Sequence, residues 1–169
     1  MITLNAETLR DQVAYEGDSF AAVLDALESL EALKAAEAGG TTDGLMTKAL
    51  SAAAHIVGAR EVWLVRLRAE DRSVDVFPDA PPLEAVRADF ARVQAEWQAL
   101  ASAADDMELA RVVAYTSREG EPRRSSVSEI CLHVYGHSMY HRGQIGALIA
   151  RMGGTSPATD FIFWSQATR

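Results

Sequence analysis

Residues 126–154 read SVSEICLHVYGHSMYHRGQIGALIARMGG. The stretch opens on Ser126 with a glutamate three residues later, a capping box that begins helices, and it closes on Gly153-Gly154, a common helix stop. Apolar residues recur between them at helical spacing: Val127, Ile130, Cys131, Val134, Ile145, Leu148, Ile149 and Met152. The pattern predicts a long helix that buries one face against other helices.

Three further helical patterns precede this stretch. They run over about residues 6–38, which end at Gly39-Gly40, over residues 42–69, and onward from Pro81-Pro82. The third pattern carries an apolar seam in alternating steps of four and three: Val86, Phe90, Val93, Trp97 and Leu100. Four amphipathic helices predict an all-α four-helix bundle. The length of 169 residues suits a single domain over residues 1–169.

Residues 105–125 do not continue the helical pattern. The part from Leu109 to Tyr115 favours extended structure, and a polar part with a glycine, residues 118–122, follows it. We expect a long crossover here, in the form of a small hairpin, before the last helix. A tail of residues 155–169 carries the aromatic residues Phe161, Phe163 and Trp164. We expect these aromatic rings to pack back on the bundle or on a partner.

Composition and charge limit the classes of partner. The net charge is −8, and the only local basic cluster is Arg123-Arg124, so a nucleic-acid partner is not expected. A small molecule or a second copy of the chain is favoured instead. No apolar run of about 18 residues predicts a membrane span, and residues 1–12 do not read as a secretory signal. The single cysteine fits a cytoplasmic location.

The four histidines are the candidate metal ligands of this chain. His133, His137 and His141 follow one another in steps of four on the last helix, with a drift of about 40° per step. His141 therefore falls within the apolar stripe, His137 at its edge and His133 toward the polar flank. A pair at i and i+4 on one helix can hold a zinc-like ion, although this spacing also recurs by chance. A third ligand must come from another helix. His55, on the second helix, is the remaining histidine, and it is either this third ligand or a solvent-facing residue.

The sequence does not favour a cysteine nucleophile or the metal-binding motifs of two other enzyme classes. Cys131 lies in the apolar stripe, and we interpret it as a small core residue, not as a nucleophile. The Glu-x-x-His pairs of di-iron bundles are absent from the sequence, as is the H-E-x-x-H motif of zinc proteases.

Residues 133–145, HVYGHSMYHRGQI, resemble the signature H-x-x-x-H-R-G-Q-I of the DinB/YfiT-like superfamily of metal-dependent enzymes, which is distinct from the DNA polymerase of the same name. The second helix around His55 and the tail at residues 159–162 are also similar to this superfamily, so the resemblance covers about residues 10–165. It implies a four-helix bundle with a divalent-metal site made of three histidines. Carried over to this chain, the ligands are His55, His137 and His141.

The remaining motif residues are expected to support these ligands. Gln144 could orient a ligand or a bound water, and Arg142 could pair with Asp160 of the tail or lie at the surface. Glycine costs about 1 kcal/mol within a helix, so Gly143 and Gly146 suggest the close approach of another helix.

Three neutral imidazoles leave a coordination position open, which permits hydrolysis by an activated water or the binding of a thiolate. The resemblance implies a transferase that uses a low-molecular-weight thiol such as bacillithiol or mycothiol. A metal-dependent hydrolase and a non-catalytic, stress-related metal-binding or dimerising protein are the alternatives. Zinc or nickel is the expected ion, and iron, manganese and cobalt also suit imidazole ligands. We expect a homodimer.

Overall fold

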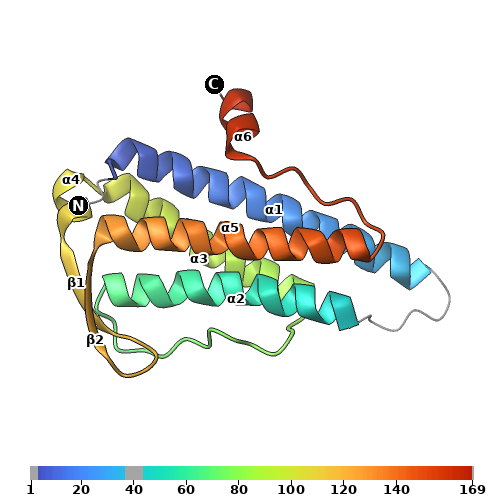
Figure 1. Cartoon of the computed structure of the whole chain (residues 1–169), viewed down its shortest axis with the longest axis horizontal. Helices are drawn as coiled ribbons and strands as arrows, with labels where there is room; N and C mark the ends of the chain where they lie inside the picture. Colours follow the sequence, from blue (N-terminus) through green and yellow to red (C-terminus); the bar gives the residue numbers. More distant parts are fainter. Residues whose placement is uncertain (1–3, 37–43, 169) are drawn as a thin grey trace.

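The computed structural model describes residues 4–36 and 44–168. Its long helices are α1 (Ala6–Ala36), α2 (Gly44–Leu67), α3 (Leu83–Ala103) and α5 (Val127–Arg151), and its short helices are α4 (Asp106–Ala110) and α6 (Phe161–Ala167). The four long helices lie side by side as a bundle (Figure 1). The prediction of an all-α four-helix bundle is confirmed.

Local sequence signals set the helix ends. Ser126 is the N-cap of α5: its hydroxyl accepts a hydrogen bond from the backbone N–H of Glu129 at 3.2 Å, and the Glu129 carboxylate accepts one from the backbone N–H of Ser126 at 2.8 Å. Pro82 precedes the first residue of α3. The predicted helix stop at Gly39-Gly40 and the predicted start at residue 42 lie outside the described residues.

The predicted hairpin is present before α5. Strands β1 (Val112–Thr116) and β2 (Pro122–Ser126) pair antiparallel, with Val112 opposite Ser126. Gly120 supplies the left-handed turn conformation, with φ of +83°. The β-prone stretch begins later than expected, because Leu109 belongs to the short helix α4 and is buried against the core.

The apolar seam of α3 faces the interior of the bundle. Val86, Phe90, Val93 and Trp97 are buried, and Leu100 is partly buried against the same core. Each large apolar side chain that leaves water stabilises the fold by about 1.5–3 kcal/mol. Helix α5 packs chiefly against α2, and α3 packs against α1 and α2. The histidine-bearing faces of α2 and α5 are thereby brought next to each other.

The α2–α3 connection, residues 68–82, runs back along α2 instead of leaving the bundle (green in Figure 1). It passes over Gly58, where an added Cβ would lie 2.7 Å from the carbonyl oxygen of Asp75. The absence of a side chain at this position lets the two backbones approach. The connection thus lies directly beside the part of α2 that carries His55.

The tail returns to α1. The ring of Tyr15 packs against those of Phe161 and Trp164, with centroids 5.2 and 5.7 Å apart, and the Trp164 indole donates a hydrogen bond to Asp18 at 2.8 Å. Phe163 stays exposed. None of the helices in the two described ranges is both long and apolar enough to cross a membrane.

Candidate metal centre

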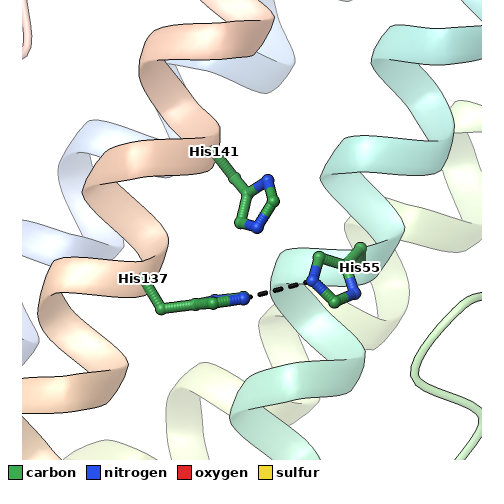
Figure 2. Close-up of side chains that lie close together, drawn as sticks. All are labelled: His55, His137 and His141. Atoms are coloured by element: carbon green, nitrogen blue, oxygen red, sulfur yellow. Dashed lines mark hydrogen bonds between the residues drawn. The ribbon is translucent and has the colours of Figure 1, made fainter.

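Three histidines from two helices converge on one point (Figure 2). His55 comes from α2, whereas His137 and His141 lie one turn apart on α5. One ring nitrogen of each lies within 4.8 Å of the others, and the group could hold a metal ion. The Nε2 atoms of His55 and His137 are 3.1 Å apart.

The ring of His55 is fixed by the α2–α3 connection. Its Nδ1 lies 2.7 Å from the carbonyl oxygen of Val76, and because a carbonyl only accepts, Nδ1 must carry the hydrogen. Phe77 stacks on the imidazole at 4.5 Å with an interplanar angle of 18°. In the neutral ring, the lone pair is then on Nε2, which faces the other two histidines.

The ring of His141 is fixed within its own helix. Its Nδ1 lies 2.8 Å from Oε1 of Gln144, so Nδ1–H donates and Nε2 is left as the coordinating atom. Gln144, which the sequence suggested could orient a ligand or a bound water, thus contacts His141, and its role in metal binding stays a prediction.

Burial keeps His137 neutral. Loss of solvent, followed by the nearby His141 and His55, lowers the pKa of His137 to about 4. Burial also lowers the pKa of His141, against a smaller upward effect of the hydrogen bond with Gln144. Both imidazoles are therefore unprotonated at neutral pH, the form that binds metals.

The donor set fits a small divalent ion. A tetrahedral ion with metal–nitrogen distances of about 2.0–2.1 Å needs nitrogens about 3.3 Å apart. The observed Nε2 separation of 3.1 Å for His55 and His137 is close to that value. Two nitrogens that both present lone pairs at this distance repel each other unless a cation or a proton lies between them. This pair therefore suits an ion between the two rings, and a ring nitrogen of His141 lies within 4.8 Å of both.

His133 lies apart from this group. Its side chain is exposed, as the helical drift predicted, and its ring packs against Trp63 at 5.4 Å. It approaches His137 only at 5.9 Å between ring centroids. The metal-binding group identified among the described residues does not include His133.

A cavity of about 550 Å³ opens beside two residues of this group, His55 and His137. It is lined by His55, Ala59, Val62, Trp63, Arg66, Val74, Val76, Phe77, Arg118, His133 and His137. Sequence patterns did not single out Val76, Phe77, Arg66 or Arg118. A glycine in the middle of α2, Gly58, was the available signal that another segment lies close to this helix.

The structure corrects two predictions about the motif, the first for Arg142 and the second for its glycines. Arg142 is buried and donates hydrogen bonds to Glu16 and to the hydroxyl of Tyr15, so it is neither a surface residue nor the partner of Asp160. Its burial follows from its position on the α1-facing side of α5, where a carboxylate compensates the charge. The structure gives Arg142 no contact with the three histidines among the described residues.

The glycines of the motif do not mark the close approach of another helix. An added Cβ at Gly143 would meet nothing within 4 Å, and one at Gly146 would meet the Ser156 side chain of the tail at 2.6 Å. The prediction of a close helix was therefore wrong. The segment that approaches Gly146 is the tail that follows α5.

Cys131 lies in the hydrophobic core, as predicted from its place in the stripe. Burial raises the pKa of its thiol to about 12. A buried thiol that stays protonated at neutral pH is a poor nucleophile.

The comparisons with known proteins agree with this architecture. The DinB family matches residues 19–168 of the chain. A crystal structure of a DinB-like protein from Bacillus cereus ATCC 10987 superposes with a TM-score of 0.65 at 20% identity, covering 93% of this chain and 99% of that one. No curated protein matches the chain at a significant level.

Proposed function

The chain belongs to the DinB family, and on this premise we propose that it binds one divalent metal ion through His55, His137 and His141 and transfers a low-molecular-weight thiol to an electrophile. Zinc or nickel is the ion that we expect in this site. The observation that carries the proposal is the convergence of three histidines beside a cavity of about 550 Å³.

A divalent ion in this site would supply positive charge that stabilises a thiolate at neutral pH. The residues of the chain prepare the site. The carbonyl of Val76 and the amide of Gln144 orient two of the rings, and burial keeps His137 neutral. Three neutral imidazole ligands would leave the full charge of a bound ion available and would leave room for a further ligand.

The family resemblance favours thiol transfer over hydrolysis, and the cavity itself has no cysteine in its described lining. The only cysteine of the chain is buried, so the nucleophile comes from outside the protein. A water nucleophile benefits from a general base, and the described lining of this cavity offers His133 for that role but no aspartate or glutamate. A thiol whose sulfur is held as thiolate needs no such base, because its proton has already been lost.

The test uses the full chain loaded with cobalt, whose spectrum reports its ligands. Glutathione, cysteine, bacillithiol and mycothiol are added in turn at millimolar concentration. We expect at least one of them to produce a sulfur-to-cobalt charge-transfer band, and we expect His137→Ala to abolish it. The matched control is His133→Ala, which changes a histidine of the same helix outside the metal group and should keep the band.

If all four thiols leave the spectrum unchanged, the thiol proposal fails. A metal-dependent hydrolase or a non-catalytic metal-binding protein would then replace it.

We also propose that two chains associate in a reducing cytoplasm. Ile162 and Phe163 on α6 are exposed large apolar side chains, and a second chain would remove them from water. Sedimentation velocity of the full chain tests this association. A monomer at all micromolar concentrations would contradict it.

A further inference from the structure

The cavity beside the metal centre has an unusual charge for this protein. The chain carries a net charge of −8, yet the lining of this cavity combines two arginines with His55, His133 and His137 and includes no described carboxylate. A concave site lined by one sign of charge concentrates ligands of the opposite sign. The surroundings of the two arginines show how such a ligand would be held.

Arg66 is anchored without an anionic partner. One Nη donates a hydrogen bond to the carbonyl of Thr116 at 3.1 Å, and the guanidinium lies over the rings of Trp63 and Tyr115, at 4.6 and 5.0 Å from their centroids. These contacts fix the plane of the guanidinium, and its other N–H groups have no hydrogen-bond acceptor among the residues that the structure describes. Burial lowers the pKa of Arg66, but an arginine remains charged at neutral pH.

Arg66 also shares a helix face with the candidate metal ligand. It follows His55 by 11 residues on α2, which is about three turns, or about 16 Å along the helix axis. Ala59 and Val62 lie between them on the cavity wall. The cavity therefore has a metal-binding end at His55 and a cationic end at Arg66, joined by small and apolar side chains.

Arg118, in the turn between β1 and β2, contributes from another element. Its guanidinium lies over the ring of Phe77 at 4.5 Å, and the same ring stacks on His55 at 4.5 Å. No ion pair joins Arg66 or Arg118 to a described residue, although the charge of Arg118 acts on the neighbouring Glu119. Arg72 and Arg92, outside this cavity, both pair with Glu61. The one carboxylate of α2, Glu61, is thus paired outside the cavity and is not among its described lining residues.

We propose that this cavity binds an organic carboxylate, with its acid group on Arg66, its apolar body along Ala59 and Val62, and the charge of Arg118 adding to the attraction. A planar carboxylate matches the fork of a guanidinium. The reactive end of the ligand then faces His55 and His137. This last statement rests on the proposed function, whereas the binding of the acid group does not.

The test is isothermal titration of the full chain, both free of zinc and loaded with zinc. The probes are cinnamate, its neutral amide cinnamamide, and phenyl phosphate. We expect cinnamate to bind both forms of the protein at least tenfold more tightly than cinnamamide does. Arg66→Gln and Arg118→Gln should each weaken the binding of cinnamate by about tenfold and leave that of the amide unchanged. Arg72→Gln, which changes an arginine outside the cavity, should match the unmodified chain.

Equal affinity for acid and amide, or Arg66→Gln and Arg118→Gln variants that bind cinnamate normally, would overturn the proposal. Binding of cinnamate only to the zinc-loaded form would overturn it too, because the metal and not the arginines would then hold the acid. Tighter binding of phenyl phosphate than of cinnamate would replace the carboxylate by a phosphate monoester. Because zinc-free binding is measured separately, a failure of the metal proposal alone would leave that result intact.

Discussion

The three histidines of the centre are held in different ways. A backbone carbonyl from the α2–α3 connection orients His55, and the side chain of Gln144 orients His141. The Nδ1 of His137 is buried and has no hydrogen-bond partner among the described residues. His55 and His141 therefore depend on different neighbours, and these two supports can be tested separately.

Gln144→Ala removes the acceptor that fixes the His141 ring. Loss of such a supporting contact weakens metal binding by about 10–100-fold, and we expect a decrease of that size in zinc affinity, measured by competition with a chromophoric chelator. Gln98→Ala, which shortens an exposed glutamine of α3, is the control and should leave the affinity unchanged. An unaltered affinity in Gln144→Ala would show that His141 needs no such support.

The low pKa of His137 makes the stability of the metal-free chain depend on pH. The unfolded state takes up a proton on this histidine near pH 6.5, whereas the folded state resists protonation until about pH 4. Since the unfolded state binds more protons in this window, the free energy of unfolding falls as the pH drops from about 6.5 to 4. Urea unfolding of the metal-free chain at pH 7 and at pH 5 measures the loss.

His137→Gln removes this titration, so the variant should lose less stability between pH 7 and pH 5 than the unmodified chain does. Equal losses in the two proteins would contradict the assignment of a depressed pKa to His137.

At the scale of elements, the α2–α3 connection is the least predictable part of the centre. The capping box at Ser126 and the seam of α3 are local patterns, and both were predicted from the sequence. The carbonyl of Val76 that holds His55 belongs to the backbone, which leaves no mark on the amino-acid pattern. Arg142 was misplaced for a related reason, because its partner Glu16 lies 126 residues away in the chain.

Gly58→Ala tests whether this connection supports the metal centre. The added Cβ would lie 2.7 Å from the Asp75 oxygen and 3.1 Å from the Cα of Val76, so the connection must move away from α2. We expect the Val76–His55 hydrogen bond to weaken and the zinc affinity to fall by about 10–100-fold, measured by the same chelator competition.

The matched control is Gly143→Ala on α5, where an added Cβ meets nothing within 4 Å. Alanine is favoured over glycine in a helix by about 1 kcal/mol, so this variant should be slightly more stable and bind zinc normally. Normal zinc affinity in Gly58→Ala would show that the connection does not determine the position of His55.

At the scale of the whole molecule, one continuous core joins the four long helices. Trp97 of α3 is central to it, with only 2% of its surface exposed and its indole N–H donated to the carbonyl of Arg60 on α2 at 3.2 Å. This core makes the bundle predictable from apolar spacing alone. The cavity was not predictable, because its walls come from α2, α5, the α2–α3 connection and the hairpin turn.

Trp97→Ala should therefore lower the free energy of unfolding by about 3–5 kcal/mol, as deletions of large aromatic side chains in cores do. Chemical denaturation followed by circular dichroism measures the change. Phe163→Ala, which truncates a side chain that is 62% exposed, should change stability by less than about 0.5 kcal/mol in the monomer. A loss below about 1 kcal/mol for Trp97→Ala would mean that α3 does not pack as described.

The central claim is that His55, His137 and His141 together hold one metal ion, and metal content tests it most directly. The full chain and its His→Ala variants at positions 55, 133, 137 and 141 are loaded with zinc, dialysed and analysed for bound metal. We expect one ion per chain in the unmodified protein and in His133→Ala, and almost none in the other three variants. Full metal content in His55→Ala would contradict the three-histidine centre.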